Sequence, residues 1–77
     1  MIRREAVTAA LLERSARLRP GTTFCPSEVA RDLAEDWRPL MPLVREVAGE
    51  MPQIIATQKG RDVDPLAAKG PIRLGRA

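Results

Sequence analysis

The sequence predicts an α+β domain in which three helices precede a β-hairpin. Helical patterns recur in three segments, and two strand-like segments flank a basic loop with a central glycine. The helices are expected at residues 2–18, 26–35 and 38–51, and the strands at 53–58 and 71–75. Helices followed by a basic hairpin are the order of a winged helix, whose second and third helices form a helix-turn-helix. We therefore expect a single winged-helix domain over residues 1–77.

The composition favours a small cytoplasmic protein without a bound metal. A chain of 77 residues has one small core and buries only about 60% of the surface that its unfolded form exposes. No apolar run has the length of a membrane span, and no secretory signal follows the charged start of the chain. One cysteine and no histidine exclude an internal disulfide and a Cys/His metal site. We expect no cofactor, no metal and no membrane partner.

The net charge of +3 is unevenly distributed along the chain. Residues 1–19 carry five arginines and two glutamates, and residues 20–37 carry one arginine against four carboxylates. Residues 38–51 are neutral, whereas residues 52–77 carry five cations against two aspartates. The positive charge of this small basic protein therefore lies at its two ends. A nucleic-acid contact would use the first helix and the C-terminal third.

Prolines and a cap residue define the ends of the helices. Pro20-Gly21 ends the first helix, and the β-branched and aromatic run Thr22–Phe24 is a candidate third strand. Pro26 suits the first position of the second helix, where its missing N–H costs nothing, and Cys25 precedes it as the cap. Pro52 ends the third helix.

Helical periodicity gives the third helix an apolar side and an opposite side that carries Arg38 and Arg45. The apolar side is expected to join residues from the other elements in one core. This predicted core consists of Leu11, Phe24, Val29, Leu33, Leu40, Val44, Val47, Ile55 and Ile72.

Two groups of cations are candidates for a nucleic-acid site. The second helix of a helix-turn-helix enters the major groove, where arginine can contact guanine, so Arg38 and Arg45 are candidate base contacts. Lys59 and Arg61 in the glycine loop and Arg73 in the return strand are candidate phosphate contacts. The alternative is a solvated helix face and a surface hairpin that is basic without binding anything.

Other noticeable residues are explained by structural roles. The aromatic residues Phe24 and Trp37 are expected to pack in the core rather than stack on bases. A cap is favoured over a reactive thiol for Cys25, because the sequence has no histidine or second cysteine to activate it. Asp62 and Asp64 are too few to hold a cation, and Asp64 precedes a proline, as is typical of a turn. We expect no enzymatic activity and no small-molecule substrate.

Several blocks of the sequence together resemble one family. They are Pro26-Ser27-Glu28-Val29-Ala30-Arg31, Trp37-Arg38, Met41-Pro42, Val44-Arg45, Thr57-Gln58-Lys59-Gly60, Val63-Asp64-Pro65 and Gly70-Pro71-Ile72-Arg73-Leu74. The set resembles a small bacterial family, the domain of unknown function numbered three-two-five-three, and it extends from about Glu5 to Leu74. The resemblance implies a winged-helix-like fold and no established activity.

We therefore expect binding of double-stranded DNA through the third helix and the basic hairpin, as a transcriptional or nucleoid accessory factor. The alternative is a winged-helix module for protein–protein contact, including self-association as a dimer, and the acidic second helix and neutral third helix favour it. DNA binding requires Arg38, Arg45 and the loop cations on one continuous face. An interaction module requires an exposed apolar patch instead.

Overall fold

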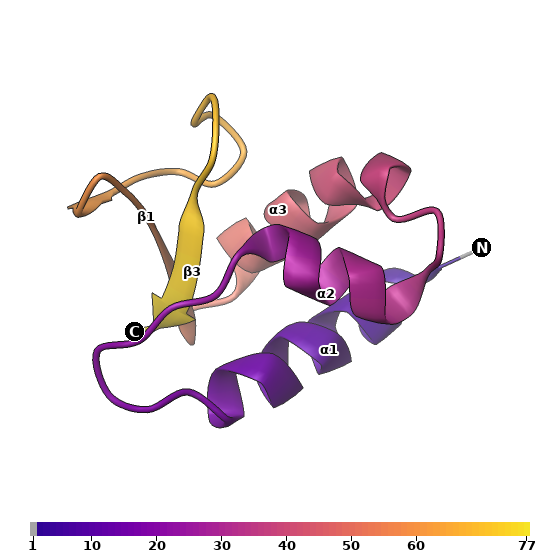
Figure 1. Ribbon diagram of the computed structural model, residues 1–77, viewed down its shortest axis with the longest axis horizontal. Helices are drawn as coiled ribbons and strands as arrows, with labels where there is room; N and C mark the ends of the chain where they lie inside the picture. Colours follow the sequence, from indigo (N-terminus) through magenta and orange to yellow (C-terminus); the bar gives the residue numbers. More distant parts are fainter. Residues whose placement is uncertain (1) are drawn as a thin grey trace.

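The computed structural model describes residues 2–77, which form three α-helices and a three-stranded antiparallel sheet (Figure 1). The strands lie in the order β2-β1-β3. In chain order the elements are α1 (Arg4–Ala16), α2 (Pro26–Leu33), the 3-10 helix η1 (Arg38–Leu40), α3 (Met41–Glu50), β1 (Ile54–Gln58), β2 (Arg61–Asp62) and β3 (Arg73–Arg76). The predicted α+β class is confirmed, and the arrangement is compatible with a winged-helix-like fold.

The three predicted helices are present, with different ends. The second begins at Pro26 as predicted, and the backbone N–H of Cys25 donates a hydrogen bond of 2.8 Å to Glu28, which caps the helix. The third begins as η1 and becomes α-helical only at Met41. Pro42 has no N–H to donate to the carbonyl of Arg38, which accepts from Met41 instead. A proline near the start of the helix therefore produces the 3-10 turn.

The predicted C-terminal hairpin is confirmed. β1 and β3 are antiparallel, with Ala56 opposite Leu74. Phe24 forms a single β-bridge with Leu74, through N···O distances of 2.8 and 2.7 Å. The candidate strand at Thr22–Phe24 is therefore reduced to one bridging residue beside β3.

The strand β2 (Arg61–Asp62) lies in the segment for which the sequence predicts a loop. It pairs antiparallel with β1, with Gln58 opposite Arg61, and only Lys59 and Gly60 lie between the two strands. Both of these turn residues have positive φ, 53° for Lys59 and 80° for Gly60. Positive φ at both central positions is the feature of a type I′ turn, whose twist matches that of the flanking strands.

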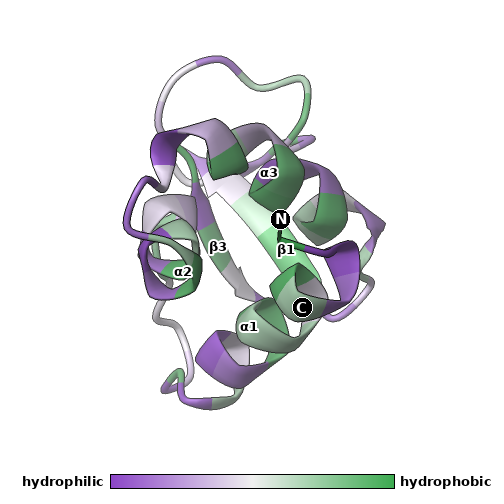
Figure 2. Cartoon of the chain, turned by 90° about the vertical axis from the view of Figure 1, so that its right-hand side faces the viewer, coloured by the Kyte–Doolittle hydropathy of each residue, from purple (hydrophilic) through white to green (hydrophobic). Residues whose placement is uncertain are grey.

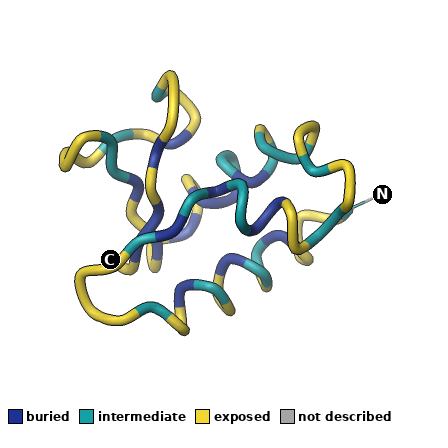
Figure 3. Tube along the Cα trace, viewed as in Figure 1, coloured by how far each residue is buried: buried dark blue, intermediate teal, exposed yellow. Residues whose placement is uncertain are grey.

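The core lies between the helices and the strands β1 and β3, where buried segments of the chain face one another in Figure 3. In Figure 2 the helical ribbons alternate between hydrophobic and hydrophilic residues, which is typical of amphipathic helices. The expected burial is confirmed for Leu11, Phe24, Val29, Val44, Val47 and Ile72. The core also includes Val7, Ala30, Ala48, Met51, Ile54, Ala56 and Leu74, with Leu33 and Leu40 partly buried against it.

The prediction for Ile55 is wrong. Its side chain is 38% exposed, whereas those of its neighbours in the alternating pattern, Ile54 and Ala56, are buried. Successive side chains in a strand point to opposite faces, so only one of Ile54 and Ile55 can face the helices. The structure places Ile54 there.

Candidate nucleic-acid interface

The arginines of α1 are largely neutralised by carboxylates of the other helices. Arg4 forms ion pairs with two glutamates of α3, and Arg14 with two carboxylates of α2. The pKa of Arg4 is raised, chiefly by its hydrogen bond with Glu46, and that of Arg14 by its hydrogen bond with Asp32. The second carboxylates of these clusters are Glu50 and Glu28.

This pairing leaves the positive charge on one side of the fold. Residues 1–51 carry eight arginines and eight carboxylates, so they are neutral. Residues 52–77, here called the sheet segment, carry five cations and two aspartates. All ion pairs found among residues 2–77 lie within the helical part, between Arg4 and Glu50. The net charge of +3 therefore belongs to the sheet segment, which extends to one side of α1 and α2 (Figure 1).

Three cations of the sheet segment line one surface hollow. Lys59 comes from the turn after β1, Arg61 from β2, and Lys69 from the loop that precedes β3. All three are exposed, and within the described part of the chain none of them forms an ion pair. Gln58, Val63 and Pro71 complete the lining. Unpaired cations around a hollow suit a phosphate group, and we call these three the cation cluster.

Sequence reasoning named Lys59 and Arg61 as candidates but did not name Lys69, which lines the same hollow. Lys69 precedes a glycine, as Lys59 does, and this repeated Lys-Gly pair was the available signal. The two lysines are ten residues apart in the chain, and only the folding of the loop shows that they line the same hollow.

Arg73 lies away from the cation cluster. It is opposite Thr57 in the sheet, whereas Arg61 is opposite the next residue, Gln58. Successive residues of a strand point to opposite faces, so the side chains of Arg73 and Arg61 leave the sheet on opposite faces. The Arg73 guanidinium donates to Thr23, from Nε to Oγ1 at 3.0 Å and from Nη2 to the carbonyl oxygen at 2.8 Å. Arg73 therefore attaches β3 to the segment before α2.

Arg45 is engaged within the protein. Its half-buried guanidinium donates hydrogen bonds to the carbonyl oxygens of Ala68 at 2.8 Å and Gly70 at 2.7 Å, with a longer contact of 3.4 Å to that of Pro65. A Cβ atom added at Gly49 would lie 3.2 Å from Pro65. The loop of residues 63–72 thus lies against the side of α3 that carries Arg45 and Gly49, which is the side predicted to enter the DNA groove.

Arg38 lies in η1, at the opposite side of Figure 1 from the turn after β1. Its guanidinium carbon is 4.8 Å from the ring centroid of Trp37, and that of Arg31 is 4.7 Å from the same centroid. Trp37 is partly buried against the core, as expected, and it holds these two arginines by cation–π contacts. Arg38 and the cation cluster are therefore separate groups.

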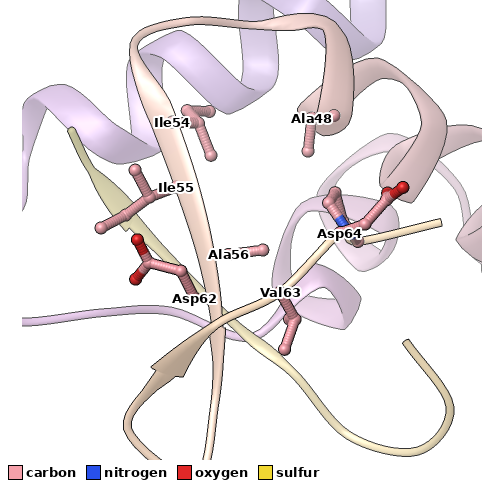
Figure 4. Close-up of a pocket in the computed structure, with 9 residues that line it drawn as sticks. Ala48, Ile54, Ile55, Ala56, Asp62, Val63 and Asp64 are labelled. Atoms are coloured by element: carbon pink, nitrogen blue, oxygen red, sulfur yellow. The ribbon is translucent and has the colours of Figure 1, made fainter. Parts of the chain in front are cut away.

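A second pocket lies between the end of α3, β1 and the residues after β2 (Figure 4). Its lining is mostly small and apolar, and its two charged residues are Asp62 and Asp64, whose carboxylates point to different sides. This composition does not suit an anion. Among residues 2–77 no group of three or more His, Cys, Asp or Glu side chains could hold a metal ion. No helix in the described chain is long and apolar enough to cross a membrane.

These observations define a small α+β domain with a neutral helical part and a basic sheet segment. Residues 4–77 match the family model described as Protein of unknown function (DUF3253), and the chain therefore belongs to this family. The family resemblance found in the sequence is confirmed, and the match extends slightly beyond the predicted range at both ends. No curated protein matches the chain.

Proposed function

We propose that this protein is a winged-helix protein that binds double-stranded DNA, mainly through phosphate contacts of its sheet segment. The observation that carries the proposal is the cation cluster, whose three charges have no carboxylate partner among the described residues. The order of helices, hairpin and the Phe24 bridge beside β3 supports a winged helix, with the turn after β1 as the tip of the wing. An accessory role in transcription or in the nucleoid is consistent with such a domain.

Binding by this cluster is expected to be weak and strongly dependent on salt. Each neutralised phosphate lowers the logarithm of the affinity by about 0.9 for each tenfold rise in salt. Three contacts therefore predict a loss of about 40-fold in affinity between roughly 50 mM and 200 mM salt. Phosphate contacts carry no direct sequence information, so different duplex sequences should bind with similar affinity.

Base readout by α3 has less support than phosphate contact. The Arg45 guanidinium is occupied by loop carbonyls, and the loop lies along the neighbouring side of the helix. Arg38 remains a candidate contact at the start of the third helix, where Trp37 orients it. The third helix is therefore proposed to contribute a contact at its N-terminal end only.

The alternative function, a protein-interaction module, requires a contiguous apolar surface. Among residues 2–77 the exposed large hydrophobic side chains are Leu12 (39%), Ile55 (38%) and Leu66 (56%). They come from three different elements, namely α1, β1 and the loop before β3. No single helix or strand face among the described residues therefore presents an apolar patch of the kind that the interaction module requires, and this supports DNA binding over that alternative.

Titration of a fluorescent duplex at two salt concentrations tests the proposal. Arg61→Ala and Lys69→Ala should each reduce the salt slope by about 0.9 and weaken binding to all duplex sequences alike. The matched control is Arg17→Ala, which removes an exposed arginine that forms an ion pair with Glu13 one helical turn away. It changes the net charge by the same amount but should leave the slope unchanged. No salt-dependent binding at about 100 μM protein, or an equal effect of the control, would refute the proposal.

A further inference from the structure

Two side chains from outside the loop of residues 63–72 satisfy its backbone carbonyls. Arg45 of α3 donates to those of Pro65, Ala68 and Gly70, as described above. From the other side, Nε2 of Gln58, the last residue of β1, donates to the carbonyl oxygens of Lys69 at 2.6 Å and Pro71 at 3.0 Å. These are five carbonyl groups within seven residues. An irregular loop has no regular backbone hydrogen bonds that could satisfy these carbonyl groups, so the two side chains donate the hydrogen bonds instead.

The start of the same loop is held by packing and by a turn. Pro65 is buried, and it lies so close to Gly49 of α3 that a larger residue there would have to displace it. The carboxylate of Asp64 accepts a hydrogen bond of 2.9 Å from the N–H of Leu66, and its carbonyl oxygen accepts one of 2.9 Å from the N–H of Ala68. The predicted turn at Asp64 is thereby confirmed. Arg45 donates to the carbonyls of Pro65 and Ala68 in this same stretch, so the turn and the hydrogen bonds of Arg45 hold the same residues together.

Lys69 lies where the two sets of hydrogen bonds meet. Its own carbonyl accepts from Gln58, and the carbonyls on either side of it, those of Ala68 and Gly70, accept from Arg45. Its side chain lines the hollow with Lys59 and Arg61. Three like charges repel one another, so the backbone must hold Lys69 in place when no anion is bound.

We propose that Arg45 and Gln58 are the positioning residues of the phosphate site: they fix the backbone around Lys69 and so complete the cation cluster. This inference rests on the proposed DNA binding and assigns a role within it to two residues whose side chains donate to the carbonyls of the loop. It also changes the role of Arg45 from reading bases to organising the loop that supplies a phosphate contact.

Two substitutions that conserve charge test the proposal. Arg45→Lys keeps the positive charge but loses the fork that reaches several carbonyls, and Gln58→Ala removes the other donor without changing any charge. Hydrogen exchange should accelerate by about fivefold at the amides of Leu66 and Ala68, the fold change expected when a typical intramolecular hydrogen bond is lost. Exchange at the β1 amides that pair with β3 should stay unchanged, because that ladder does not depend on the loop.

Duplex DNA affinity provides the second measurement. Each variant should bind several-fold more weakly, with a salt slope reduced by about 0.9, because the contact of Lys69 is lost. In a Lys69→Ala background, Arg45→Lys and Gln58→Ala should then have no further effect on affinity, a coupling that general destabilisation would not produce.

The two measurements separate this proposal from the proposed function. Unchanged exchange at Leu66 and Ala68 in both variants overturns the positioning role whether or not DNA binds. Faster exchange with unchanged affinity, or additive losses in the Lys69→Ala background, also overturns it. If the wild-type protein does not bind duplex DNA, both the proposed function and the role of Arg45 and Gln58 in phosphate binding are wrong. Faster exchange in the variants would still show that these two residues hold the loop.

Discussion

Replacing Lys59 by asparagine should stabilise the protein and weaken its binding to DNA. Lys59 has a φ of 53°, and it is the non-glycine residue with positive φ among residues 2–77. It is exposed at the tip of the turn after β1, so no packing compensates for this conformation. Strained backbone is often retained at functional sites, and here the strained residue also carries one charge of the cation cluster.

The size of the stabilisation follows from the turn geometry. The left-handed conformation costs an ordinary L-residue roughly 1–2 kcal/mol, and asparagine tolerates it better than other non-glycine residues. Asn-Gly is also a favoured pair for a turn with two positive φ angles. Lys59→Asn should therefore raise the free energy of unfolding by about 0.5–1 kcal/mol, which corresponds to an increase in Tm of roughly 2–8 °C for a domain of this size.

The effect on DNA binding should have the opposite sign. Asparagine removes one of three proposed phosphate contacts, so the salt slope should fall by about 0.9 and the affinity should decrease at low salt. Thermal and urea denaturation would measure stability, and duplex titration at two salt concentrations would measure binding.

Lys59→Gln is the matched control, because it removes the same charge without relieving the turn. It should weaken DNA binding as much as asparagine does but should not raise Tm. The reasoning would be refuted if the two variants had equal stability, since backbone strain would then contribute nothing. If neither variant altered the salt slope, the proposed phosphate contact of Lys59 would be refuted.

Two further predictions concern the fold. Val44 is completely buried on the inner side of α3, so Val44→Ala should lower the free energy of unfolding by about 1–3 kcal/mol, measured by urea denaturation; a change below about 0.5 kcal/mol would contradict its place in the core. Cys25 precedes α2 at the cap position, where serine is preferred, so Cys25→Ser should change stability by less than about 0.5 kcal/mol and leave duplex binding intact. Lost binding by a folded Cys25→Ser protein would instead point to a function of the thiol.

The sequence was sufficient to predict the helices and the strands β1 and β3 because these depend on local signals. Pro26 begins α2 as its preference for the first helical turn suggests. The apolar spacing of Val44 and Val47 correctly identifies the inner side of α3. β2 was missed because Lys-Gly is not one of the usual pairs for a tight turn, and its geometry requires a lysine with positive φ.

The error at Ile55 has a general cause. The pair Ile54-Ile55 offers two equally apolar neighbours, and the strand can direct only one of them towards the helices. The choice depends on the register with β3, in which Ala56 faces Leu74, and the register is not visible in the local sequence. Nothing in the composition of β1 distinguishes the two possibilities.

A different limitation of the local sequence explains why the surroundings of Arg45 were not predicted. A helical wheel correctly places this residue on the side away from the core, but it represents only the helix itself. The carbonyls that accept its hydrogen bonds belong to residues 20 to 25 positions later, in an irregular loop. Helical periodicity therefore predicts which side of a helix a residue occupies, but not what covers that side.

The separation between neutral helices and a basic sheet segment makes the protein an electric dipole. The molecule measures 33 × 26 × 19 Å, whereas electrostatic interactions in physiological salt are screened over about 8 Å. A polyanion that approaches the cation cluster therefore experiences a local charge density well above what a net charge of +3 spread over the whole surface would give. If the protein binds DNA as proposed, this field should favour encounters in which the sheet segment faces the polyanion, and low salt should accelerate them.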